Sequence, residues 1–155
     1  MQNVFVRLMK PEDLEQVYRI DVLTQKEYLG SAWELMEKDE QNTHLVSKSL
    51  TFSAIVSLGL SQVATEKNGT IMGFILAYSD NSIEDTVIVK YIAVDTAYRR
   101  CGVGDALYGG LIQTAKKLAK KQILAYINTD NPKSISLHRK IGFLIKPRIE
   151  AVLTI

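Results

Sequence analysis

Residues 99–104 have the types and spacing that bind an anion. They read Arg-Arg-Cys-Gly-Val-Gly and open a segment of helical periodicity. The first turn of a helix has backbone N–H groups without partners and carries a partial positive charge. Glycines at 102 and 104 let a phosphate approach the backbone, and Arg99 and Arg100 add charge-assisted hydrogen bonds. The segment therefore predicts a phosphate or pyrophosphate site built largely from backbone.

Two elements must position this loop. The run Val87–Val94 is apolar and β-branched, which predicts a strand buried on both faces. Apolar residues recur close to the helical period from Val103 to Leu118, which predicts a helix. A further apolar run at 123–127 predicts a second strand, parallel to the first, because a right-handed strand–helix–strand unit gives a parallel pair.

The loop narrows the kind of phosphate ligand. The P-loop pattern is absent, and the place of the third glycine in a dinucleotide fingerprint is taken by Leu107. The pattern [RQ]-x-x-G-x-[GA] is present, with Arg99, Gly102 and Gly104 in its fixed places. With the preceding Ile92-Ala93-Val94-Asp95, it resembles the acetyl-CoA site of the GNAT N-acetyltransferase superfamily. An ordinary strand–helix corner with surface arginines is the alternative.

A second motif lies at 131–143. The family pattern N-x-x-[AS]-x-x-[LF]-Y-x-x-x-G-F is matched by Asn131, Ser134, Leu137, Gly142 and Phe143. The departure is His138, where the family has tyrosine. The form Ser-Ile-x-Leu-His-x-x-x-Gly-Phe is similar to the phosphinothricin acetyltransferase branch.

The resemblance implies a GNAT fold of the α/β (α+β) class over a single domain, residues 1–155. Such a fold has a mixed, mostly antiparallel sheet of six to seven strands, flanked by about four helices, and its central parallel pair splays apart. We expect strands at 4–8, 62–65, 71–78, 87–94, 123–127 and 149–155. We expect helices after Pro11 and Ser31, within 43–58, from 103 to 118 and from 131 to 142. Gly73 predicts a bulge or a close backbone approach, and Gly109 and Gly110 predict tight packing of a helix on the sheet.

The resemblance also implies roles for individual residues. The pantetheine arm enters between the splayed strands and bonds the backbone of Ile92, Ala93 and Val94. The amide of Val94, at a bulge, polarises the thioester carbonyl. The residues expected to hold the pyrophosphate are Arg99, Arg100, Cys101, Gly102, Val103 and Gly104. Asn131 and Ser134 of the second motif complete the predicted cofactor site.

Acetyl transfer also needs a base for the acceptor ammonium and an acid for the leaving thiolate. We expect His138 to be the acid, because imidazole titrates near pH 6.5; a structural bond to a backbone carbonyl is the alternative. The base of some GNAT proteins aligns with Ile88, so Glu84 and Asp85 are the catalytic candidates. A solvated strand start is the alternative for these two carboxylates. Tyr91 or a relay of water molecules can also serve.

Composition limits the partners. A single cysteine excludes an internal disulfide and a cysteine-rich metal site, and no metal is expected. Residues 1–89 carry 7 basic and 13 acidic side chains, whereas residues 90–121 carry 7 and 2, so positive charge gathers around the predicted pyrophosphate site. No apolar run approaches the roughly 20 residues of a membrane span, and no signal-peptide pattern is present. We expect a cytoplasmic protein with neither a membrane nor a nucleic-acid partner.

The predicted activity is transfer of an acetyl group from acetyl-CoA to a primary amine on a small, amino-acid-like molecule. Acetylation of a protein or peptide is the alternative within the same fold. A catalytically silent acyl-CoA-binding module is the alternative outside enzymes. The resemblance leaves a homodimer open.

Overall fold

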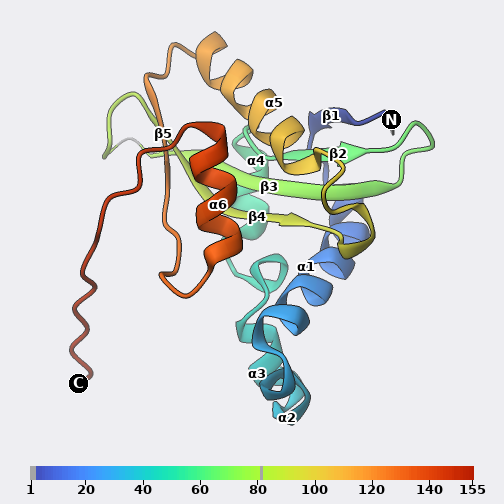
Figure 1. The fold of residues 1–155 in the computed structure, drawn as a ribbon, viewed down its shortest axis with the longest axis vertical. Helices are drawn as coiled ribbons and strands as arrows, with labels where there is room; N and C mark the ends of the chain where they lie inside the picture. Colours follow the sequence, from blue (N-terminus) through green and yellow to red (C-terminus); the bar gives the residue numbers. More distant parts are fainter. Residues whose placement is uncertain (1–2, 81) are drawn as a thin grey trace.

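A mixed sheet with the strand order β1-β2-β3-β4-β5 forms the centre of the molecule (Figure 1). The computed structural model describes residues 3–80 and 82–155. The strands are β1 (Phe5–Leu8), β2 (Gln62–Thr65), β3 (Ile71–Ser79), β4 (Thr86–Val94) and β5 (Gln122–Ala125). Neighbouring strands pair antiparallel, except for β4 and β5, which are parallel.

Helices cover both faces of this sheet. The first half of the chain supplies α1 (Leu14–Leu29), α2 (Ser31–Leu35), α3 (Lys38–Thr43) and α4 (Phe52–Ser57). Short 3₁₀ turns lie at Pro11–Asp13, Val46–Lys48 and Thr96–Tyr98. α5 (Val103–Lys117) joins β4 to β5, and α6 (Pro132–Ile141) follows β5. Figure 1 shows α5 on the face of the sheet opposite α1, with α6 in front of β4 and β5.

Two apolar clusters hold these layers together. Leu107 and Leu111 of α5 pack on one face of the sheet, together with Ile75 of β3. On the other face, Ile20 of α1 packs with Phe74 of β3. Because both faces of β3 are covered, its residues are buried from end to end apart from the last two, which explains the continuous apolar sequence.

The number of elements differs from the prediction. The described residues form five strands and six α-helices, rather than six to seven strands and about four helices. The predicted strand at 149–155 is wrong, because this segment has no regular structure and both Ile149 and Ile155 are fully exposed. Alternating apolar residues form a strand only where a partner strand offers hydrogen bonds. Figure 1 shows the segment leading away from the other elements.

β4 and β5 pair over only part of their length. The parallel ladder joins Thr86–Val89 to Gln122–Ala125, whereas β4 continues to Val94. At the same point the ladder between β3 and β4 shifts register, and Lys90 is the extra residue. A bulge bends and twists its strand, so the two parallel strands part here. The end of this ladder is consistent with the predicted splay, and the bulge lies at Lys90 and not at Val94.

Two glycines lie where a neighbouring atom leaves no room for a side chain. At Gly73 of β3, an added Cβ would stand 2.7 Å from Ala93 O, so the predicted close approach of two backbones is confirmed. At Gly110 of α5, an added Cβ would overlap Gln62 Oε1 and stand 2.8 Å from Val6 Cγ1. The predicted tight packing of α5 on the sheet is therefore confirmed at Gly110. Gly109 faces open space.

Replacing Gly110 by alanine should lower the free energy of unfolding by about 1–3 kcal/mol, the usual cost of overpacking. The added Cβ overlaps a Gln62 side chain that is fixed by a 2.9 Å hydrogen bond to Thr114 Oγ1. Gly109→Ala is the matched control, because its Cβ meets nothing within 4 Å and alanine favours a helix by about 1 kcal/mol. Denaturant unfolding measures both variants. Equal stability of the two would contradict this packing.

Candidate active site

The outer edge of β4 is the first part of the site. In an antiparallel ladder, alternate residues bond the partner strand. Asp95 N–H donates to Met72 O at 2.8 Å, and Ala93 O also points to β3. Ile92 and Val94 therefore direct their N–H and C=O groups to the other side, from which β5 has diverged. A ligand that entered between the strands would meet these groups. The backbone contacts of all three residues stay predictions, with Ile92 and Val94 facing away from β3 and Ala93 facing it.

The glycine loop, residues 99–104, follows this edge of β4 and runs into the first residues of α5. Gly102 has a φ of +78°, in the left-handed region that favours glycine, and an added Cβ there would meet nothing within 4 Å. Arg100 and Cys101 are exposed beside it. The loop therefore presents an accessible helix N-terminus next to basic side chains, which is a geometry that binds phosphates.

The two residues that begin α5 anchor this loop. Val103 is 1% exposed and belongs to the core under α5. At Gly104 an added Cβ would stand 3.3 Å from the Leu137 side chain of α6. Gly104 thus lets α6 pack against the start of α5, a role that the sequence pattern did not indicate.

Arg99 forms an ion pair with another residue of the chain. Its guanidinium bonds both carboxylate oxygens of Glu27 near the end of α1, and Lys133 Nζ lies 2.8 Å from Glu27 Oε1. The bond from Arg99 is the largest of the effects that lower the pKa of Glu27 to about 2. No local pattern in the sequence indicates Glu27, because its partners lie 72 and 106 residues further along the chain.

His138 lies in the core between α5 and α6. It is 1% exposed, its Nε2 is 2.5 Å from Tyr108 Oη, and its Nδ1 is 2.7 Å from Ser134 O. Because a carbonyl only accepts, Nδ1 carries the proton and Nε2 accepts from the Tyr108 hydroxyl. Burial lowers the pKa of His138. The ring also contacts Phe143 edge-on, with centroids 5.0 Å apart. This closed arrangement supports the structural alternative for His138, and the acid role stays a prediction.

The other two residues of the second motif begin α6. Asn131 Oδ1 accepts from Ser134 N–H at 3.1 Å, so Asn131 caps the helix. Pro132 occupies the first turn, and Gly142 ends the helix with a φ of +110°. This places the start of α6 after the end of β5, beside the gap between the parted strands. The cofactor contacts of Asn131 and Ser134 stay predictions.

A family profile decides membership. The profile of the acetyltransferase (GNAT) family matches residues 19–143, which include most of α1, the parted strands, the glycine loop and the second motif. The chain belongs to the acetyltransferase (GNAT) family. It is an acetyl-CoA-dependent N-acyltransferase, as the sequence predicted.

Solved structures share the GNAT fold. The PaiA N-acetyltransferase from Thermoplasma acidophilum, in complex with coenzyme A, has a TM-score of 0.75 at 17% identity, over 93% of this chain and 91% of its own. AAC(6')-Iy in complex with the bisubstrate analogue CoA-S-monomethyl-acetylneamine has a TM-score of 0.68 at 18% identity, over 98% of both chains. The ribosomal-protein-S18-alanine N-acetyltransferase from Escherichia coli has a TM-score of 0.60 at 20% identity, over 90% and 77%. No curated protein sequence matches the chain.

The two carboxylates predicted as base candidates lie away from the rest of the GNAT site. Glu84 and Asp85 precede β4, whereas Val94 ends it, and the nine residues of β4 span about 30 Å. Asp85 pairs with Lys121 at 2.6 Å, and this hydrogen bond lowers its pKa. The placement supports the alternative of a solvated strand start.

Tyr91, the third base candidate, lies next to the bulge and contacts α1. Its hydroxyl is 2.9 Å from Gln25 Nε2 and 3.2 Å from Thr24 Oγ1. The nearby Asp21 is fully buried, and its Oδ2 accepts two hydrogen bonds from Ser47, at 2.8 and 2.6 Å. Burial, followed by the charge of Asp21, raises the pKa of Tyr91 to about 12. A phenol with that pKa keeps its proton at neutral pH, so it cannot readily accept the proton of the acceptor ammonium.

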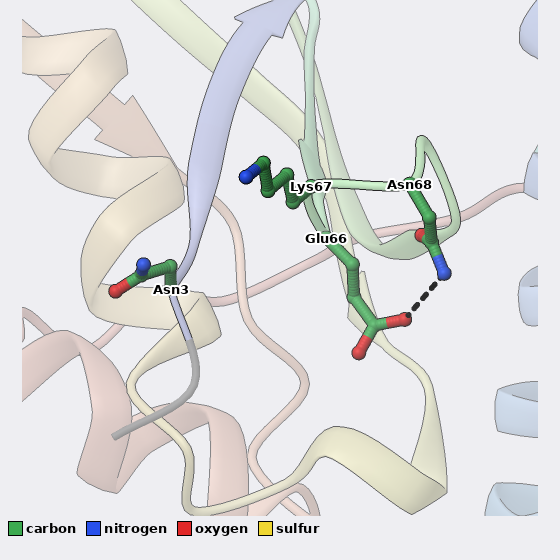
Figure 2. A pocket seen from close by; sticks show the side chains of 4 residues that line it. All are labelled: Asn3, Glu66, Lys67 and Asn68. Carbon is green, nitrogen blue, oxygen red and sulfur yellow. Dashed lines mark hydrogen bonds between the residues drawn. The ribbon is translucent and has the colours of Figure 1, made fainter.

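An open hollow at the β2–β3 hairpin lies outside this site. Figure 2 shows its four lining residues, Asn3, Glu66, Lys67 and Asn68, with Asn68 Nδ2 3.4 Å from Glu66 Oε2. None of them belongs to the glycine loop or to the outer edge of β4. The hollow is therefore separate from the residues that the family motifs place at the cofactor.

None of the helices within residues 3–80 and 82–155 is long and apolar enough to cross a bilayer. Nor do three or more histidine, cysteine, aspartate or glutamate side chains gather there as ligands for a metal ion.

The burial of His138 predicts a pH dependence of stability. Its pKa is lowered in the folded protein, so the unfolded chain takes up the proton first as the pH falls below about 6.5. The free energy of unfolding should fall with pH from that point, by up to about 1.4 kcal/mol per pH unit, until the lower folded pKa is passed. His138→Gln should remove this slope. The exposed His44 is the control: His44→Gln should keep it. Urea unfolding between pH 7.5 and 5 gives both slopes, and an unchanged slope in His138→Gln would refute the assignment.

Proposed function

We propose that this protein transfers the acetyl group of acetyl-CoA directly to the primary amine of a small, amino-acid-like molecule. The observation that carries the proposal is the end of the β4–β5 ladder at Val89, which leaves the outward-facing backbone groups of Ile92 and Val94 without a partner strand ahead of the glycine loop. The amides of an extended pantetheine arm suit such an edge, as in strand addition, and a diphosphate suits an accessible helix N-terminus. Acetyl-CoA supplies the activated acetyl group.

The residues of the site have separate tasks. The N–H of Val94 donates to the thioester carbonyl oxygen, where negative charge develops during transfer. Because the ladder to β3 fixes β4 at this point, the donor needs no reorganisation. Ile92 orients the arm beside it. Arg99, Arg100 and the amides of residues 102–104 hold the diphosphate.

Three observations support the choice of a small acceptor. Residues 1–89, which include α1 to α4, carry 13 acidic against 7 basic side chains, a balance that favours a cationic amine. AAC(6')-Iy, which shares the fold, was solved with a bisubstrate analogue containing acetylneamine. The likeness of residues 134–143 to the phosphinothricin acetyltransferase branch favours an amino-acid-like amine, and this finer placement stays a prediction.

Proton transfer does not require the predicted catalytic side chains. The acceptor ammonium must lose a proton before attack, with a pKa near 10.4 for a lysine-like amine. Glu84 and Asp85 lie far along β4, and Tyr91 has a pKa of about 12, so a relay of water molecules to bulk solvent is the base that we favour. A thiol titrates near pH 8.5, so the thiolate leaves readily at neutral pH and needs no acid from His138.

Acetylation of a protein or peptide amine is the second candidate. The fold shared with the ribosomal-protein-S18-alanine N-acetyltransferase supports it. The two candidates differ in the size of the acceptor that the site must admit. A silent acyl-CoA-binding module is the third alternative, since it would have the same cofactor edge and loop.

Turnover with a panel of amines tests these candidates. The purified protein, acetyl-CoA and a thiol reagent that detects released CoA are combined in turn with aminoglycosides, free amino acids and short peptides with a free N-terminus. We expect release of CoA with small amines and little with peptides. Turnover confined to peptides would favour the second candidate. Binding of acetyl-CoA in a calorimeter without turnover on any amine would support the silent module and contradict the proposal.

A further inference from the structure

Glu27 joins two cations from opposite sides of the gap between β4 and β5. Arg99 lies in the loop that follows β4, and Lys133 lies in the first turn of α6, which follows β5. Arg99 Nη1 donates to Glu27 Oε1 at 2.6 Å, and its Nη2 pairs with Oε2. Lys133 Nζ donates to Oε1 at 2.8 Å. One carboxylate near the end of α1 therefore offsets positive charge on both sides of the gap.

The neighbouring residue extends this bridge. Tyr28 Oη donates to Asp130 Oδ1 at 2.9 Å and lies 3.4 Å from Asn128 Nδ2. Both partners lie between β5 and α6. The last turn of α1 thus contacts the segments that follow each of the parted strands. Glu27 is held there at the same point where the proposed diphosphate site begins.

A carboxylate and a diphosphate compete for the same donors. Both accept the paired N–H groups of a guanidinium, and like charges at contact distance repel each other. If Arg99 binds the diphosphate, as the proposed function has it, the carboxylate must give up that bond. We propose that Glu27 is an internal counter-ion, which the diphosphate of acetyl-CoA displaces from Arg99.

The exposure of the three groups allows this exchange. The side chains of Arg99, Glu27 and Lys133 are 34%, 37% and 79% exposed, and ion pairs in contact with water are weak. The pair between Arg7 and Asp13 differs. Asp13 is 8% exposed and also accepts from the Lys10 N–H at 2.8 Å, so it is fixed in the fold. Among the ion pairs of residues 3–80 and 82–155, the Glu27 bridge alone combines a partner in the glycine loop with access from solvent.

Glu27→Gln tests the proposal, because it removes the charge but keeps the size of the side chain. Titration calorimetry with acetyl-CoA at low ionic strength should give a dissociation constant about two- to fivefold lower than that of the unmodified protein, the range of an exposed ion pair. High salt should reduce the difference. Glu34→Gln is the matched control, because Glu34 of α2 pairs with Lys26 near the end of α1 at 2.6 Å. This variant should leave the dissociation constant unchanged. Thermal unfolding of each variant confirms that it folds.

A second ligand, which lacks the diphosphate, tests whether the effect of Glu27 depends on that group. Acetyl-pantetheine has the arm without the diphosphate, so its affinity should be the same in Glu27→Gln and in the unmodified protein. Unchanged or weaker acetyl-CoA binding by the variant overturns the counter-ion role while the cofactor site stands, and so does a gain that extends to acetyl-pantetheine. A failure of every protein to bind acetyl-CoA overturns the proposed cofactor site together with the inference.

Discussion

The parting of β4 from β5 after Val89 is the constraint on which the rest of the site depends. On one side β4 stays paired with β3 as far as Val94, and Gly73 lets the two backbones approach closely there. On the other side the ladder to β5 has ended. The bulge at Lys90 lies at the point where the ladder to β5 ends, and the ladder to β3 continues beyond it. Backbone donors are thereby fixed in place beside a gap, which is the preorganisation that acyl transfer needs.

The helices that follow the two parallel strands keep this gap in shape. The His138–Tyr108 pair and the contact of Gly104 with Leu137 hold α6 against α5. The loop before α5 and the first turn of α6 are therefore fixed relative to each other. In this arrangement the second motif lies along one side of the site, and its histidine packs in the core between α5 and α6. Glu27, near the end of α1, is the only carboxylate among the described residues that pairs with Arg99 of the glycine loop.

Features encoded over a few neighbouring positions could be predicted from the sequence. The strand at 87–94, the glycine loop, the helix from Val103 and the cap at Asn131 follow from residue type and spacing, and the structure contains them. Partners far apart in the chain could not be predicted. A tyrosine at an apolar helical position gives no sign that its hydroxyl will meet an imidazole, since that depends on how two helices pack. The strand predicted at 149–155 failed for the same reason, because alternation does not supply a partner strand.

Amide hydrogen exchange at Ile92 and Val94, measured by NMR with and without acetyl-CoA, tests the central claim most directly. The structure predicts that the ligand slows exchange at these two amides and at residues 102–104. The amides of Tyr91 and Ala93 face β3 and should change little. Unchanged exchange at Ile92 and Val94 in the presence of bound acetyl-CoA would contradict the claim that the parted edge of β4 holds the cofactor.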